Sequence, residues 1–282
     1  MTAAVPPLAA DLTEGLRRLK LAAMRRLAPE LLLTAKTQRW APEDLLRTLV
    51  EAEISARDAS NARTRLRNAA FPVTKTLDDF DLSVSSVPQA TFAYLASLEW
   101  ITAAENLCLV GPAGTGKSHL LVALGTAAVQ AGHKVRYLTA ADLAETLYRG
   151  LADNSVGRII DTLLRNDLIL IDEVGFAPLD DTGAQLLFRV VAAAYERRAL
   201  GIASHWPFES WGRFLPEHTT AVSLLDRLLH HASVVVTDGD SYRMRQARAR
   251  KGTTLNKTRS TRGVGTFTWP PAGTKTWPLT RT

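Results

Sequence analysis

The stretch from Gly111 to Ser118, GPAGTGKS, constrains the fold of this chain more than any other, because it matches the phosphate-binding loop pattern G-x-x-x-x-G-K-[ST] in full. The apolar run NLCLVG (106–111) leads into it, and the helical pattern KSHLLVALG follows it. In such a loop the backbone N–H groups and the positive end of the following helix bind phosphate oxygens. The stretch therefore predicts an α/β fold that binds a phosphorylated ligand.

Short apolar runs are the candidate strands of this fold. Runs that are buried on both faces and separated by helices indicate a parallel sheet with crossover helices. The runs are NLCLVG (106–111), KVRYLTA (134–140), DLILIDE (167–173), LGIASH (200–205) and SVVVTD (233–238). We therefore expect a P-loop parallel sheet of about five strands flanked by helices.

The first part of the chain, residues 1–70, is expected to form a small, basic helical domain. Its apolar residues recur at intervals of three and four, as in an amphipathic helix: Leu12, Leu16, Leu19, Ala23 and Leu27. Pro29 and Pro42 stand where new helices are expected to begin, because a proline in the first turn gives up no hydrogen bond. The helix after Pro42 is predicted to be long.

Charge is distributed unevenly along the chain. Residues 1–70 carry 12 Lys and Arg against 8 Asp and Glu, residues 71–242 carry 12 against 20, and residues 243–282 carry 10 against none. An acidic centre between basic ends is typical of an enzymatic core with nucleic-acid-binding flanks, although solvated helix faces and a basic tail have the same composition. Four arginines crowd the end of the predicted long helix, more than the helix dipole requires, and we interpret them as a phosphate-contacting face: Arg57, Arg63, Arg65 and Arg67.

The core is expected over residues 71–248, after the connector FPVTKTLDDFDLS. The segment 249–282 is rich in Thr, Gly, Pro and basic residues without periodicity, so we expect it to be disordered. Basic residues beside Trp269 and Trp277 suit a DNA- or protein-contacting arm, and a non-functional extension is the alternative.

The composition indicates a cytoplasmic protein. No run approaches the roughly 18 uncharged apolar residues that span a membrane, and the first 20 residues lack the pattern of a secretory signal. Cys108 is the only cysteine, which excludes an intrachain disulfide, and its apolar surroundings predict a buried filler.

Each residue type in the loop has a chemical role in binding phosphate or Mg²⁺. The glycines permit the turns that direct N–H groups at phosphate, Lys117 reaches the β- and γ-phosphates, and the Ser118 hydroxyl ligates Mg²⁺. The residues expected to contact the nucleotide here are Gly111, Pro112, Ala113, Gly114, Thr115, Gly116, Lys117, Ser118 and His119.

A second element of the site is LILIDE, a predicted buried strand that ends in Asp172 and Glu173. Asp172 is placed to hold the Mg²⁺ shell, and Glu173 to accept a proton from the attacking water. Two carboxylates here favour hydrolysis over small-molecule kinase chemistry, which stays a third possibility. The Asn-Lys-x-Asp pattern of small GTPases is absent, so ATP is the expected nucleotide.

Two arginines downstream are candidates for contact with the nucleotide. Arg227, in LLDRLLHH, lies on a predicted apolar helix, from which it could reach the γ-phosphate bound by a neighbouring subunit. A charge pair with Asp226 is the alternative interpretation. Arg243, in GDSYRMR, follows the last strand and is a weaker candidate for contact within the same subunit.

Five stretches together resemble the IstB helper ATPases of bacterial insertion sequences, relatives of the DnaC helicase loaders within the AAA+ ATPases. They are the loop, LILIDEVG, YERRALGIASHWPFESWG, LLDRLLHHA and GDSYRMR, and the resemblance covers residues 10–248. It implies an ATPase that assembles as a homo-oligomer on duplex DNA, remodels the DNA and stimulates a partner transposase. It also implies that Lys117, Ser118, Asp172 and Glu173 have the roles given above, and that Arg227 acts in trans.

The chain departs from the family pattern at His205, in ASHWPF, where the resemblance predicts an asparagine that positions the attacking water. A neutral imidazole can replace one hydrogen bond of that amide and adds sensitivity to pH. Slower hydrolysis and a purely structural histidine are the alternatives. A helicase loader that acts mainly through protein contacts is the alternative to the transposition helper.

Overall fold

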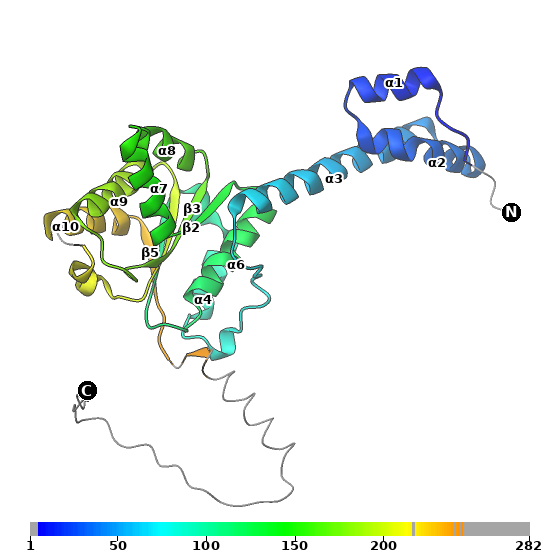
Figure 1. The fold of residues 1–282 in the computed structure, drawn as a ribbon. Coiled ribbons are helices and arrows are strands. Elements are labelled where there is room, and N and C mark those ends of the chain that lie inside the picture. The colour runs from blue at the N-terminus through cyan, green and yellow to red at the C-terminus, as the bar shows by residue number, and fades with distance from the viewer. Residues whose placement is uncertain (1–4, 216–217, 240, 243, 245–282) are drawn as a thin grey trace, which may run out of the picture. The chain divides into compact units, whose positions relative to one another are not determined.

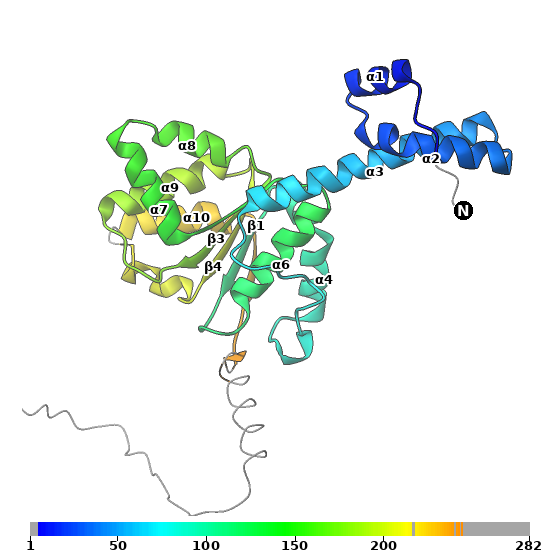
Figure 2. The same ribbon diagram turned by 45° about the vertical axis from the view of Figure 1, so that its right-hand side comes forward.

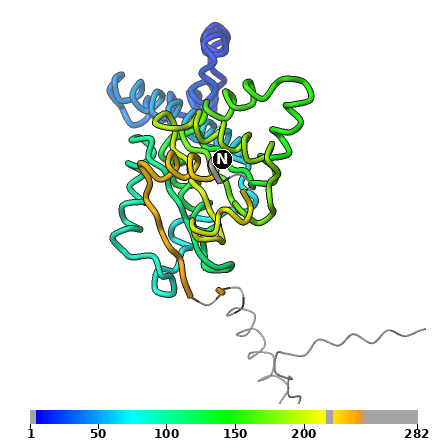
Figure 3. The backbone as a smooth tube through the Cα atoms, turned by 90° about the vertical axis from the view of Figure 1, so that its left-hand side faces the viewer, coloured from blue at the N-terminus to red at the C-terminus, as the bar shows by residue number. Residues whose placement is uncertain are grey.

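The protein is seen in a computed structural model that describes residues 5–215, 218–239, 241, 242 and 244 (Figure 3). The chain divides into two compact units, residues 1–242 and 243–282, and all the described residues except Met244 belong to the first. Arg243 and the segment 249–282, for which sequence patterns predict a nucleotide contact and a disordered arm, lie outside the described residues.

A parallel sheet of five strands forms the centre of the first unit, with the order β2-β3-β4-β1-β5. All five predicted strands are confirmed, with ends shifted by one or two residues. They are β1 (Asn106–Val110), β2 (Val135–Thr139), β3 (Leu168–Val174), β4 (Ala199–Ser204) and β5 (Ala232–Val236). Because the strands are parallel, their carboxyl ends meet at one edge of the sheet, where α/β proteins bind ligands.

Helices cover both faces of this sheet (Figures 1 and 2). On one face pack α7 (Ala140–Ala152), α8 (Val156–Leu163), α9 (Asp181–Ala194) and α10 (His218–Leu229). On the other face pack α4 (Gln89–Ser97), α5 (Glu99–Thr102) and α6 (Lys117–Gln130). Two short 3₁₀ helices, η1 (Leu82–Val84) and η2 (Phe208–Arg213), lie in the connections.

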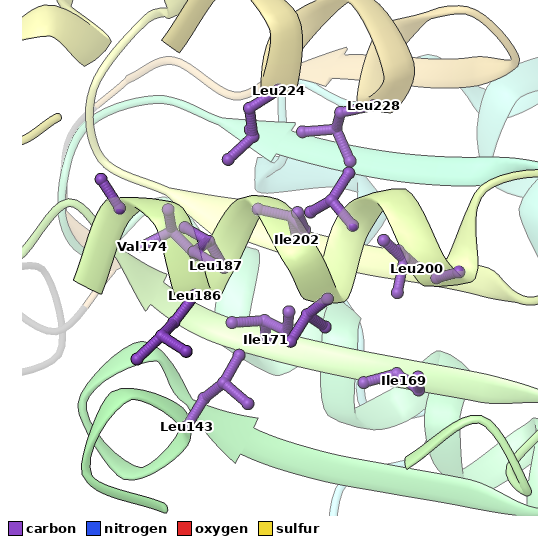
Figure 4. Packing of buried hydrophobic residues seen from close by; sticks show 14 of the residues in the cluster. Leu143, Ile169, Ile171, Val174, Leu186, Leu187, Leu200, Ile202, Leu224 and Leu228 are labelled. Carbon is purple, nitrogen blue, oxygen red and sulfur yellow. The ribbon is translucent and has the colours of Figure 1, made fainter. Parts of the chain in front are cut away.

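Each face of the sheet buries its own apolar cluster, as expected for strands whose side chains alternate between two covered faces. Figure 4 shows the first cluster, in which leucines of three helices meet isoleucines of β3 and β4: Leu143, Leu187, Leu224, Ile169, Ile171 and Ile202. Cys108 of β1 belongs to this cluster and is 1% exposed. Burial raises the pKa of its thiol to about 12, so the predicted role of Cys108 as a buried filler is confirmed.

The first three helices in chain order are α1 (Ala10–Arg18), α2 (Ala22–Gln38) and α3 (Pro42–Ala69). Pro42 is the first residue of α3, as predicted, but the expected helix start at Pro29 is wrong, because Pro29 lies inside α2. The helix continues through Pro29 because its alanine face is buried, and that packing outweighs the lost hydrogen bond. Of the helices that the structure describes, none is long and apolar enough to cross a membrane.

Candidate nucleotide-binding site

The phosphate-binding loop joins β1 to α6 at the carboxyl edge of the sheet, as its sequence predicts. Two of its glycines illustrate what this backbone requires. Gly111 has φ +147°, and a Cβ there would lie 1.9 Å from the carbonyl oxygen of Thr237. Gly116 has φ +95° and caps the N-terminus of α6, a conformation that an L side chain disfavours. The loop therefore places the first-turn N–H groups of α6 at the sheet edge.

Lys117, the first residue of α6, turns back into this loop. Its Nζ donates hydrogen bonds to the carbonyl oxygens of Gly111 and Pro112, both at 2.6 Å, and the residue is only 9% exposed. A buried ammonium group next to the positive end of a helix fits an anionic ligand such as a phosphate. Ser118 follows in the first turn of α6 and is half-buried.

Residues of the connector before the sheet form an aromatic wall beside the loop. The ring of Phe80 would lie 3.2 Å from a Cβ at Gly116, contacts the imidazole of His119 edge-on, and stacks on Phe92 with centroids 5.8 Å apart. Nε2 of His119 is buried and lacks a hydrogen-bond partner among the described residues. Sequence analysis did not assign Phe80 to the site, although an aromatic residue among the acidic residues of a connector is a detectable signal.

The segment after β5 lies against the other side of the loop. The hydroxyl oxygens of Thr115 and Thr237 are 2.7 Å apart, and the backbone N–H of Tyr242 donates to the carbonyl oxygen of Gly114 at 3.0 Å. Thr237 and Tyr242 therefore lie beside the loop, while the nucleotide contact of Arg243 stays a prediction.

Asp172 lies inside β3 at the same edge and is 3% exposed. One carboxylate oxygen accepts a hydrogen bond from the Tyr137 hydroxyl at 2.9 Å, and the other accepts one from the backbone N–H of Glu173 at 2.8 Å. Burial, together with the charge of Asp172, raises the pKa of Tyr137, so this hydroxyl stays protonated and donates. Tyr137 could not be assigned to the site from the sequence, because no local pattern shows which strand lies beside β3.

Glu173 follows Asp172 but points to solvent, unlike its buried neighbours in β3. Its φ is +59°, and the pairing of β3 with β4 shifts register between Ile171 and Val174. A bulge of this kind redirects a side chain at the end of a strand. The adjacent carboxylates therefore differ: Asp172 is fixed and buried, while Glu173 is exposed at the edge.

His205 directly follows β4 at this edge. Its ring packs on Trp206, with centroids 4.8 Å apart, and near Phe176 at 6.4 Å. Burial, together with the positive charge of Lys117, lowers the pKa of His205 below its ordinary value, so the imidazole is neutral at pH 7.

Arg227 lies in a different part of the unit, on α10. Its guanidinium donates to the carbonyl oxygen of Ser223 at 3.1 Å and packs over the ring of Phe188 of α9, 5.0 Å from its centroid. The predicted trans role of Arg227 stays a prediction. Helix α10 holds this side chain half-buried in the layer that α9 and α10 form on one face of the sheet.

The strand order β2-β3-β4-β1-β5, the loop after β1 and the buried carboxylate in β3 define a P-loop ATPase of the AAA+ class. The family described as IstB-like ATP binding protein matches residues 14–250. The chain belongs to this family, as its sequence pattern predicts.

Two relatives are named as ATP-binding proteins of insertion sequences. That of IS21 from Pseudomonas aeruginosa is 32% identical over 244 residues, which are 86% of this chain and 92% of the relative. That of IS5376 from Geobacillus stearothermophilus is 33% identical over 215 residues, which are 76% and 86%. This chain is therefore similar to these relatives over most of their length.

Two solved structures share the fold. One is AMPPCP-bound DnaA from Aquifex aeolicus, with a TM-score of 0.50 and 21% identity over 66% of this chain and 57% of that one. The other is described as a DNA replication initiation factor, with a TM-score of 0.51 and 21% identity over 65% and 55%. The chain spans little more than half the length of either, and at this identity the likeness shows the fold alone.

Proposed function

We propose that this chain is a cytoplasmic, ATP-dependent helper of DNA transposition, which assembles on duplex DNA and stimulates a partner transposase. One observation carries the proposal: a complete P-loop site, with Lys117 and Asp172 buried at one sheet edge, occurs in a chain that belongs to the IstB-like family. Two relatives of this chain are named after insertion sequences, which supports transposition as the process.

In this proposal the carboxyl edge of the sheet binds ATP. The loop from Gly111 to Ser118 receives the phosphates, and Lys117 exchanges its two carbonyl partners for β- and γ-phosphate oxygens. Phe80 and His119 offer an apolar, aromatic wall for the base. Mg²⁺ would be held by Ser118 and Asp172, where it neutralises charge that develops on the phosphates.

Hydrolysis is assigned to Glu173 and His205, at the edge where the phosphates of ATP would bind. Glu173 is exposed at the edge and takes a proton from the attacking water. His205, neutral at pH 7, replaces the asparagine expected from the family pattern and orients the same water by one hydrogen bond. Arg243, which follows Tyr242 in the sequence, is assigned a contact with the nucleotide in the same subunit.

The nucleotide is proposed to lie between subunits of a homo-oligomer. Arg227 on α10 is assigned to the γ-phosphate bound by the neighbouring subunit, where it stabilises transition-state charge. Assembly then depends on ATP, and hydrolysis dismantles it.

DNA binding is assigned to the helical domain at residues 1–70, in front of an ATPase core at residues 71–248 and a basic tail at residues 249–282. Contacts of Arg and Lys with phosphates carry little sequence information, so binding is expected to be non-specific and salt-sensitive. Arg57 no longer belongs to this face, because it pairs with Glu53 at 2.9 Å and donates to the carbonyl oxygen of Lys20. Arg63, Arg65 and Arg67 remain.

A helicase loader that acts mainly through protein contacts is the second candidate, because the family that the sequence resembles is related to the DnaC helicase loaders. Such a loader would bind its partner through the N-terminal helices and would not bind bare duplex DNA. An electrophoretic shift of duplex DNA with and without ATP separates the two candidates: ATP-dependent binding favours the transposition helper.

The experiment that tests the proposal is ATP hydrolysis with and without duplex DNA. Hydrolysis by the unaltered chain is expected to rise with DNA. Lys117→Ala is expected to lower the rate by at least about 100-fold, because it removes the positive charge that binds the phosphates. Lys134→Ala, an exposed lysine before β2, is the control and should leave the rate unchanged. Equal rates for Lys117→Ala and the unaltered chain would overturn the assignment of the site.

A further inference from the structure

Three side chains with metal-ligating atoms lie together at the edge of the sheet opposite the phosphate-binding loop. Glu196 is in the turn that leads from α9 into β4, and His230 and His231 are in the turn that leads from α10 into β5. One ligand atom from each residue lies within 4.8 Å of the other two, and all three side chains are exposed.

We propose that Glu196, His230 and His231 form a binding site for a divalent transition-metal ion, with Zn²⁺ as the ion that fits best. Nε2 of His231 and Oε1 of Glu196 are 3.5 Å apart. Two ligand atoms that bind one zinc ion at about 2.0–2.1 Å with tetrahedral angles lie roughly 3.4 Å apart. Two imidazoles and one carboxylate form a donor set that zinc uses with water in the fourth position.

A hydrogen bond to the ring of His230 supports this assignment. The hydroxyl of Tyr195 lies 2.8 Å from Nδ1 of His230, and their rings are in contact. A partner on one ring nitrogen fixes the orientation of a metal-binding histidine and decides which nitrogen keeps its lone pair. Tyr195 precedes Glu196 directly, so one turn supplies both a ligand and the residue that orients another.

The backbone of Glu196 has a left-handed conformation. Its φ is +53°, and it follows the end of α9, where the N–H groups of Arg197 and Arg198 both donate to the carbonyl oxygen of Ala194. Glycine is the residue that favours this left-handed position after a helix. A glutamate here breaks the local preference, and its carboxylate lies beside His231.

Metal binding at this site would join the α9–β4 turn to the α10–β5 turn. His230 is three residues after Arg227, so the ion would also fix the end of the helix that carries that arginine. An ion that binds the folded chain and not the unfolded chain raises the thermal midpoint of unfolding.

Calorimetric titration of the nucleotide-free full chain with Zn²⁺ tests the proposal. We expect one ion per chain, and visible absorption of four-coordinate Co²⁺ when Co²⁺ replaces zinc. His230→Ala and His231→Ala should each weaken zinc binding at least tenfold, the effect typical of changes around a metal. His133→Ala is the matched control, because His133 is near one carboxylate, that of Asp167 at 4.0 Å, and this change should leave zinc affinity unaltered.

Glu196→Gly separates loss of a ligand from loss of the fold. Glycine suits the backbone at this position, so the metal-free midpoint of unfolding should be retained while zinc affinity falls at least tenfold. A chain that binds no zinc would overturn the proposal, and so would a His230→Ala/His231→Ala double variant that binds it as tightly as the unaltered chain. The readout is metal binding without ATP or DNA, so it is independent of the proposed function.

Discussion

Asp172 is a charged group in a place that disfavours charge. The residue is 3% exposed at the carboxyl edge of the parallel sheet, and burying an ionised carboxylate is costly unless hydrogen bonds compensate. The Tyr137 hydroxyl and the Glu173 N–H supply two such bonds. Tyr137 therefore holds the Asp172 carboxylate in the orientation that the proposed Mg²⁺ site requires.

Removing this hydroxyl is expected to destabilise the fold. Tyr137→Phe should lower the free energy of unfolding by about 1.5–3 kcal/mol, because it removes a buried hydrogen bond to a charged acceptor. Urea unfolding without nucleotide measures the change. The matched control is Tyr94→Phe, since the Tyr94 hydroxyl donates to the exposed carboxylate of Glu105 at 2.6 Å, where water replaces it. A Tyr137→Phe variant that unfolds at the same urea concentration as the unaltered chain would contradict this role.

At the scale of elements, two parts of α3 contact different neighbours. Glu53, in its middle, is buried and accepts the N–H groups of Ala23 and Met24 at the start of α2 and the side chain of Arg57. The hydrogen bond from the Met24 N–H is the largest cause of the lowered pKa of Glu53. The end of α3 packs on β2 and α6, and there the side chain of Arg136 donates to the carbonyl oxygen of Asn68. Between these fixed regions lie Arg63 and Arg65.

The arginines near the end of α3 test whether this helix binds DNA. If each of Arg63, Arg65 and Arg67 neutralises one phosphate, changing all three to Ala should make the slope of log K against log salt shallower by roughly 2.7. Fluorescence anisotropy of a labelled duplex at several salt concentrations measures this slope. Arg47→Ala is the control on the same helix, because Arg47 is paired with Asp44 at 3.2 Å. An unchanged slope in the triple variant would show that the duplex binds elsewhere.

At the scale of the molecule, the proposed catalytic groups do not all meet in one subunit. Lys117, Asp172 and Glu173 lie at the carboxyl edge of the sheet, whereas Arg227 packs on Phe188 in the layer formed by α9 and α10. An arginine in that position completes a site only if a second subunit brings its own nucleotide to it. The assembly is therefore the proposed catalytic unit.

Mixing two inactive variants tests this arrangement. Lys117→Ala and Arg227→Ala are each expected to hydrolyse ATP at least about 100-fold more slowly, but an equal mixture should recover about one quarter of the normal rate per site. Recovery is expected because some neighbours then combine an intact loop with an intact arginine. ATP turnover under assembly conditions measures it. A mixture no faster than the separate variants would place Arg227 outside a shared site.

The five strands, the loop and the carboxylates at the strand end could all be predicted from the sequence. Each depends on residues close together in the chain: the alternation of apolar runs with helices, and the spacing of glycines and Lys117. The expectation of a helix start at Pro29 is wrong, and no local pattern showed that the Arg57 side chain has partners within the protein. Pro29 lies inside a helix whose alanine face is buried, and the side chain of Arg57 pairs with Glu53 of the same helix and donates to the carbonyl oxygen of Lys20.

The sequence alone determined the class of fold and the residues for phosphate chemistry, because hydrophobic periodicity and loop spacing act over a few residues. Only the tertiary structure decided the strand order, the pairing of Tyr137 with Asp172, and the meeting of Glu196 with His230 and His231. Each of these depends on packing between segments more than 30 residues apart, which no local pattern encodes.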